Sequence, residues 1–191
     1  MKRERWCLQK IMNLTINTNI GKEEKANYYI IADHLRTTIF ALADGANFEP
    51  KGRGYILKKL IKKTALLSYL FRFTVEDLVK ISERLIEINS FCYPHLKEKE
   101  DLIIEELRKE TSKSSKLVNN AAEKLNSYYS SAVTAQEIFF WYDTQGIPLE
   151  LIRTYFQQRN HQFPHQEFDK LLTEQKKRSL TDRKKKNIST F

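Results

Sequence analysis

The chain has 191 residues, of which 41% are hydrophobic and 12% aromatic, and 33 Lys and Arg against 24 Asp and Glu give a formal net charge of +9. This apolar content supports a packed core and excludes disorder throughout, while the cationic excess favours an anionic partner. Only five Gly and four Pro interrupt the chain, which favours one helical domain over a fold of many short strands.

The first regular element follows a weakly periodic lead-in, residues 1–25, that is partly loop. Apolar positions at helical spacing predict a helix over residues 26–43. Asp44-Gly45 should end this helix, with Gly45 as the residue that follows the C-cap. Pro, Gly and polar residues then predict a connecting loop.

The second predicted helix, residues 55–71, has a one-sided charge distribution. No acidic residue stands between Glu49 and Glu76. The expected apolar stripe is formed by Ile56, Leu57, Leu60, Ile61 and Leu67. Four lysines face away from it: Lys58, Lys59, Lys62 and Lys63. Such a face can be solvated without binding anything. A helix whose charged face is only solvated usually has side chains of opposite charge four residues apart, so the absence of acidic residues favours phosphate contact.

Helix caps define the rest of the chain. Thr74 with Asp77, and Thr134 with Glu137, are capping-box signals for helices that begin just after each threonine. Pro94, Pro148 and Pro164 each mark the start of a further helix; these are predicted to reach about Leu125, Gln158 and the basic end of the chain. The sequence therefore predicts an all-α fold of about six helices, with one long helix and a basic C-terminal tail at residues 179–191.

No short motif identifies an enzyme. The chain lacks the phosphate-loop, dinucleotide-binding and H-E-x-x-H patterns. His161 and His165 are separated by a proline that begins a helix, so we expect no metal site there. A single histidine on a helix, such as His34, is more often a packing residue than a catalyst. The local pattern at Asp143 favours a role in an Asx-turn or as a cap of the following helix.

The two cysteines, the N-terminus and the apolar runs indicate the compartment. Cys7 and Cys92 have neither zinc-knuckle spacing nor a disulfide framework. No signal peptide or membrane span is evident, so we expect a cytoplasmic protein without a membrane partner.

Several longer strings resemble alanyl-tRNA synthetases. They are I-I-A-D-H-L-R at 30–36, F-A-L-A-D-G at 40–45, G-R-G-Y-I-L-K-K-L-I-K-K at 52–63, F-F-W-Y-D-T-Q-G-I-P-L-E-L at 139–151 and F-D-K-L-L-T-E-Q-K-K-R at 168–178. Their order and rough spacing match the family over about residues 11–180. The resemblance implies the helical tRNA-recognition region of that family, here residues 26–178, without the class II catalytic core or the editing domain.

The resemblance also implies roles for individual residues. Asp143 would accept a hydrogen bond from the guanine of a G·U wobble pair in the acceptor stem of alanine tRNA, with Thr144 and Gly146 in its turn and His34 and Arg36 as supporting residues. The RNA backbone would be held by Arg53 and the four lysines. The family has arginines where these lysines stand, so the charge is kept but the bidentate geometry is lost. Some members have an asparagine, a second reader of the wobble pair, where Gly52 stands in this chain.

The function expected from this resemblance is tRNA binding by a truncated or split synthetase that contributes to alanylation of tRNA. No catalytic residue, metal or cofactor is expected in this chain, because ATP and Mg²⁺ belong to an intact synthetase; a separate catalytic-core chain would be a partner, and enzyme activity stays uncertain. The alternatives are a stand-alone RNA-binding or scaffold protein without a role in aminoacylation, and a gene remnant that no longer packs.

Overall fold

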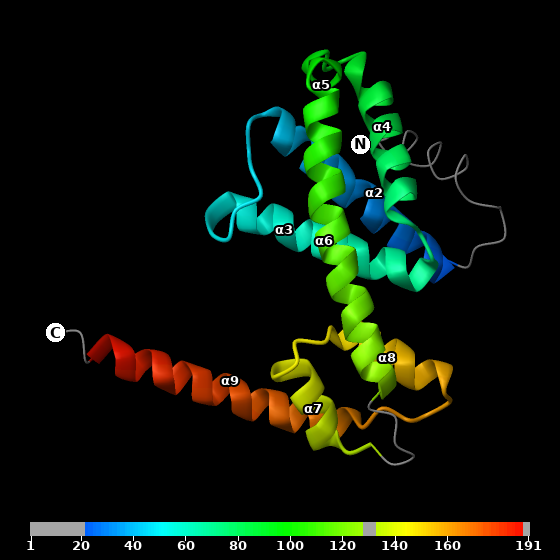
Figure 1. Ribbon diagram of the computed structural model, residues 1–191. Coiled ribbons are helices and arrows are strands. Elements are labelled where there is room, and N and C mark those ends of the chain that lie inside the picture. The colour runs from blue at the N-terminus through cyan, green and yellow to red at the C-terminus, as the bar shows by residue number, and fades with distance from the viewer. Residues whose placement is uncertain (1–21, 128–132, 189–191) are drawn as a thin grey trace. The chain divides into compact units, whose positions relative to one another are not determined.

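The computed structural model describes residues 22–127 and 133–188, and the side chains of residues 26–127 and 133–178. All regular elements in this described part are α-helices, which confirms the all-α prediction (Figure 1). They are α2 (Lys22–Ala43), α3 (Gly52–Phe71), α4 (Val75–Ser90), α5 (His95–Glu98), α6 (Glu100–Ser127), α7 (Ala135–Asp143), α8 (Leu149–Gln158) and α9 (His165–Ile188). The chain forms two compact units, unit 1 up to Asn119 and unit 2 from Asn120, and the division falls within α6.

Helix α2 ends as its sequence predicts. Gly45 has φ of +88° and donates its N–H to the carbonyl of Leu42 at 3.0 Å, while Ala46 donates to Ala41 at 2.9 Å. These two bonds are the Schellman arrangement, in which a left-handed residue lets the chain turn back over the last helical turn. The turn starts the return of the chain toward α3.

The start of α3 depends on a close approach between backbones. This helix begins at Gly52, three residues before the predicted start at Tyr55, so Gly54 lies in its first turn. A Cβ on Gly54 would lie 2.3 Å from the carbonyl oxygen of Asn47 and 2.5 Å from the backbone nitrogen of Glu49. Only a residue without a side chain therefore allows the α2–α3 connection to pass over this turn.

Both predicted capping boxes are present. The hydroxyl of Thr74 accepts from the backbone N–H of Asp77, and the Asp77 carboxylate accepts from the backbone N–H of Thr74 at 2.8 Å. Thr134 and Glu137 form the same pair of bonds at the start of α7. Hydrogen bonds from the threonines lower the pKa of the Asp77 and Glu137 carboxyl groups. Each box thus satisfies N–H groups that would otherwise lack partners at a helix start.

The long helix predicted from Pro94 is interrupted. Residues from His95 to Glu98 form the short helix α5, and Lys99, with φ of −106° and ψ of 12°, leaves helical geometry before α6 begins. The Lys99 ammonium donates to the carbonyl of Ala43 at the end of α2, at 2.5 Å. The interruption therefore coincides with a contact to α2, 56 positions away, which no local sequence pattern contains.

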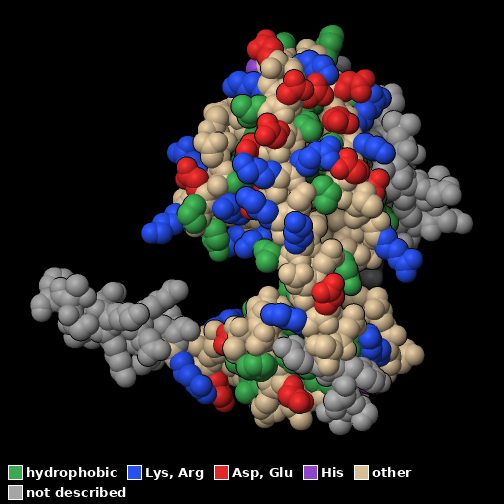
Figure 2. Space-filling view, viewed as in Figure 1, with side chains coloured by type: hydrophobic (Ala, Val, Ile, Leu, Met, Phe, Trp, Pro, Cys, Tyr) green, Lys and Arg blue, Asp and Glu red, His purple; other side chains and the backbone are tan. Residues whose placement is uncertain are grey.

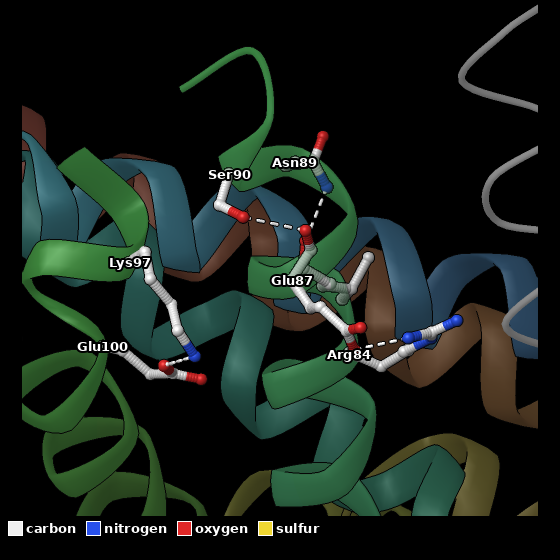
Figure 3. A network of polar contacts seen from close by, with 7 residues as sticks. Arg84, Glu87, Asn89, Ser90, Lys97 and Glu100 are labelled. Carbon is white, nitrogen blue, oxygen red and sulfur yellow. Dashed lines mark hydrogen bonds and ion pairs between the residues drawn. The ribbon is translucent and has the colours of Figure 1, made fainter. Parts of the chain in front are cut away.

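Polar contacts surround the junction of α4, α5 and α6. Figure 3 shows Arg84 paired with Glu87 on α4 and Lys97 of α5 paired with Glu100 at the start of α6. The ion pairs lower the pKa of Glu87 and raise that of Lys97. In the last turn of α4, Ser90 and Asn89 donate to backbone carbonyls, at 2.8 and 2.7 Å. The Glu87 carbonyl is among the last four of the helix, which lack an intrahelical partner, and the Ser90 hydroxyl supplies it with one.

Each unit has its own apolar interior. In unit 1 it consists of Ile31, Leu35, Ile39, Leu42, Ala43, Ile61, Leu67, Leu78, Ile81, Leu85, Ile86, Leu96, Ile103 and Leu107. Helix α2 packs against α3, α4 and α5. In unit 2 helices α7 and α9 pack together, and Ile138, Ile152 and Phe168 are almost fully buried. No helix in the described ranges is long and apolar enough to cross a membrane.

We expect Gly54→Ala to lower the free energy of unfolding by about 1–3 kcal/mol, the cost of overpacking a filled site. Intrinsic propensity predicts the opposite sign, because Ala favours a helix over Gly by roughly 1 kcal/mol. Gly52→Asn is the matched control, since nothing lies within 4 Å of its Cβ and Asn tolerates its φ of +64°. Urea unfolding followed by circular dichroism measures both, and a Gly54→Ala protein as stable as the parent would contradict the close approach.

Candidate nucleic-acid interface

The outer face of α3 brings together the cationic residues named from the sequence. Its inner face is buried, with Gly54, Leu57, Ile61, Thr64 and Ala65 among the covered residues. Arg53, Lys59 and Lys62 are exposed, and Lys58 and Lys63 are half-buried. The packing of the inner face therefore turns the five cations toward solvent or to the rim of the helix.

The expected apolar stripe of α3 needs one correction. Ile56 was placed on the buried side, but 58% of it is exposed, and its neighbour Tyr55 is 43% exposed. The stripe prediction counted every apolar residue at near-helical spacing, whereas the buried face is centred on Leu57 and Ile61. Two apolar side chains consequently lie on the same surface as the lysines.

One of these apolar side chains interacts with a lysine. The Lys59 ammonium lies 4.7 Å from the centre of the Tyr55 ring, one helical turn away. A cation over an aromatic face gains a modest electrostatic attraction while it keeps its charge. The pair holds a positive charge and a ring next to each other on the exposed surface of α3.

The charges of α3 and α6 are distributed differently, because α3 has no acidic residue in its own sequence whereas α6 alternates acidic and basic residues. In α6, Lys109 pairs with Glu106 at 3.3 Å and Lys113 with Glu110 at 4.0 Å. In α3 the first turn has no acidic residue and the N-cap, Lys51, makes no side-chain cap. Figure 2 shows Lys and Arg side chains over the part of unit 1 where α3 lies, and Asp and Glu gathered toward the end with α5. The α3 surface therefore gathers positive charge near a helix N-terminus that no side chain of its N-cap residue caps.

A groove lies at the N-terminal end of the same helix. It has a volume of about 440 Å³ and is lined by the α2–α3 connection and the first turns of α3, with Asn47, Glu49 and Arg53 at its surface. The close approach at Gly54 holds this connection against α3. Arg53 thus stands between the groove and the lysine face.

His34 lies beneath the lysine face and links α2 to α3. It is half-buried and forms a hydrogen bond with the backbone of Leu60, close to the Lys63 ammonium. Burial lowers the pKa of His34, outweighing the opposing effect of Asp33. Arg36 is engaged elsewhere, because its guanidinium pairs with Asp33 at 3.0 Å on the same helix.

Asp143 lies in unit 2, as the last residue of α7, and its side chain is exposed. One carboxylate oxygen, Oδ1, accepts a hydrogen bond from the Nε2 of Gln175 on α9 at 2.9 Å. The following helix is capped by Pro148 instead, so the side chain bonds to α9 and not to the start of α8. Gln175 was not among the residues singled out, although it stands within the E-Q-x-x-R string that carries part of the resemblance.

The turn after Asp143 is well defined. Thr144 caps α7 and donates its N–H to the carbonyl of Phe140 at 2.9 Å. Gly146 has φ of +66°, and Ile147 then donates to Trp141 at 3.0 Å and is buried. Thr144 and Gly146 therefore form the turn beside Asp143 in unit 2, whereas His34, Arg36 and the α3 cations all belong to unit 1.

The family model and the individual relatives that match this chain indicate the same family. The model for tRNA synthetases class II (A) matches residues 6–190. The chain is 30% identical over 160 residues to the alanine–tRNA ligase of Campylobacter jejuni, covering 82% of this chain and 19% of that protein. It is 31% identical over 178 residues to the alanine–tRNA ligase of Rickettsia bellii, covering 88% and 20%. The chain thus spans about a fifth of the length of the curated relatives it matches.

The match overturns one expectation from the sequence. The chain was interpreted as a recognition region only, outside the class II part of the family. That interpretation is wrong, because the class II model extends over nearly the whole chain. Short matching strings indicate which family a stretch resembles, but they do not define where the family's class II region ends.

We expect the His34 environment to make the fold less stable in mild acid. Because the pKa of His34 is lowered in the folded chain, the unfolded chain binds the proton first. The stabilisation of the folded chain by neutral His34 is fully present above the unfolded pKa of about 6.5. It is lost as the pH falls through the lowered pKa of the folded chain. Between pH 7.5 and pH 5.5 the midpoint temperature of thermal unfolding should fall further for the parent than for His34→Gln. The glutamine keeps a polar side chain but does not titrate. Equal losses would contradict a role for His34, since both proteins share the other histidines.

Proposed function

The chain belongs to the class II (A) tRNA synthetase family, and from this premise we propose that it binds the acceptor stem of alanine tRNA and distinguishes a G·U wobble pair within it. The relatives are alanine–tRNA ligases, which supports tRNA as the RNA and alanylation of tRNA as the process to which the chain contributes. The RNA backbone is contacted by unit 1 and the base pair by unit 2.

The observation that carries the proposal is the cationic face of α3, a helix that contains no acidic residue. Arg53 and Lys58, Lys59, Lys62 and Lys63 lie on one helix whose first turn has no acidic residue. An RNA duplex presents closely spaced phosphates, and binding lysines release condensed counterions from them. This gain does not depend on base sequence, so the α3 cations position the RNA without reading it.

Base reading is assigned to Asp143. In an A-form helix the minor groove is wide and shallow, so a side chain can reach the base edges there. The guanine 2-amino group is a donor in that groove, and a G·U wobble pair leaves it without its usual partner. An exposed carboxylate only accepts hydrogen bonds, so Asp143 is chemically suited to this group.

The remaining residues named from the sequence take supporting roles in the proposal. Thr144 and Gly146 form the turn that presents Asp143. His34 supports α3 through the Leu60 backbone, and Arg36 acts on the same helix through Asp33. None of these four is required to contact the RNA bases.

We expect Lys62→Ala to weaken binding of all duplex RNAs alike. Loss of one phosphate contact should reduce the slope of log K against log salt concentration by about 1. Lys109→Ala is the matched control, because Lys109 is an exposed lysine of unit 1 that is already paired with Glu106. Fluorescence titrations of labelled acceptor-stem RNA across several salt concentrations measure the slope, and an unchanged slope for Lys62→Ala would remove α3 from the interface.

We expect Asp143→Ala to lose discrimination and not general affinity. Removing one good base-edge contact should cost about 1–3 kcal/mol of preference for the G·U stem over a G·C variant. The two RNAs are compared under identical salt, with both proteins shown to be folded by circular dichroism. If the parent protein binds both stems equally, the proposed reading is wrong, and a general RNA-binding or scaffold role is favoured instead.

A further inference from the structure

The Asp143 carboxylate is held by a second helix, and this contact has a consequence for how it reads RNA. Its Oδ1 accepts a hydrogen bond from Gln175 of α9 at 2.9 Å. A carboxylate offers two oxygens, each with two lone pairs, and it rotates freely when nothing holds it. A bond to one oxygen fixes that rotation and leaves the other oxygen in a defined direction.

The geometry of α9 shows that this contact is built into the packing. Phe168 is buried and Leu171, Leu172 and Gln175 are half-buried, while the residues between and beside them are exposed. Their spacing of i, i+3, i+4 and i+7 places them on one face of the helix. Gln175 therefore lies at a position of the packed face where an apolar residue would continue the pattern.

The opposing face of α7 has the matching arrangement. Phe139 and Tyr142 pack against Phe168, with ring centres 6.2 and 5.8 Å apart. Asp143 follows Tyr142 directly and stands four residues after Phe139, so it shares the side of α7 that faces α9. The aromatic contacts hold the two helices together, and the amide and the carboxylate meet at the exposed end of that contact.

From this arrangement we infer that Gln175 is a positioning residue: its amide holds one oxygen of Asp143 so that the other accepts from the RNA base. The inference rests on the proposed function. Because an ionised carboxylate can only accept, the glutamine must present its NH₂ group to it. Removing this donor leaves Asp143 in place but frees its carboxylate to rotate, so the preference for the G·U stem falls.

The test uses variants of the whole chain that separate donor from shape. Gln175→Met keeps the length of the side chain and its packing but has no donor. Gln175→Glu keeps the shape and solubility but replaces the donor with a second carboxylate, which repels Asp143. Gln175→Lys supplies an ammonium group as the N–H donor in place of the amide. Gln166→Met, an exposed glutamine on the same helix, is the control.

Binding of the G·U and G·C acceptor stems is measured for each variant, together with thermal unfolding. We expect the ratio of the two affinities to fall about 2- to 10-fold in Gln175→Met, the range that one hydrogen bond supports. Gln175→Glu should lose at least as much of the ratio, and Gln175→Lys should recover part of it. Affinity for the G·C stem should stay unchanged in Gln175→Met, which alters no charge, whereas the charged variants shift the affinities for both stems alike. In an Asp143→Ala background, Gln175→Met should have no further effect on the ratio.

The outcomes separate the two proposals. If Asp143→Ala abolishes the preference and the donor-free Gln175 variants keep it, the positioning role is wrong and the reading by Asp143 stands. If Gln175→Met loses affinity for both stems equally, the residue has only a structural role and the inference is again wrong. If the parent protein has no preference, or keeps it in Asp143→Ala, the proposed function itself fails.

Discussion

The packing of α3 against α2 determines which side of α3 meets solvent, and much of unit 1 follows from it. Gly54 lets the α2–α3 connection lie directly on the first turn, and Ile61 is fully buried about two turns later. A helix with one face fixed in this way has no rotational freedom left. The lysines lie on the exposed face or at its rim, and they form a single surface because no acidic residue is interspersed among them.

Unit 2 fixes a single polar group by the same means. Phe139, Tyr142 and Phe168 hold α7 beside α9, and the end of that apolar contact brings Gln175 to Asp143. Neither side chain needs to be buried for the arrangement to be specific, because the helices that carry them are already fixed. Unit 1 thus presents an array of positive charges on α3, and unit 2 presents one oriented hydrogen-bond acceptor, Asp143.

Local sequence signals predicted the helix ends well, and long-range contacts account for the differences. The Schellman turn at Gly45 and the capping boxes at Thr74 and Thr134 involve residues within five positions of each other, so a short window contains all their information. The break at Lys99 occurs where its ammonium bonds to a carbonyl of α2, and the Asp143–Gln175 bond joins residues 32 positions apart. The exposure of Ile56, predicted with Leu57 in the buried stripe, likewise depends on what packs against α3, which periodicity alone does not specify.

The residue types of the two surfaces decide how an RNA sequence could be read. Lysine is a compact, rotatable charge that lacks the fixed fork of arginine, so the α3 face can hold phosphates but gives little geometric selectivity. The position before Arg53 is Gly52, whose φ of +64° suits Gly and Asn alike, but glycine has no side chain with which to read a base. In the proposed function, discrimination therefore falls on one carboxylate. When a single acceptor reads the base pair, no other group compensates if its oxygen points in the wrong direction. The direction in which Gln175 holds the Asp143 carboxylate therefore sets how well the wobble pair is distinguished.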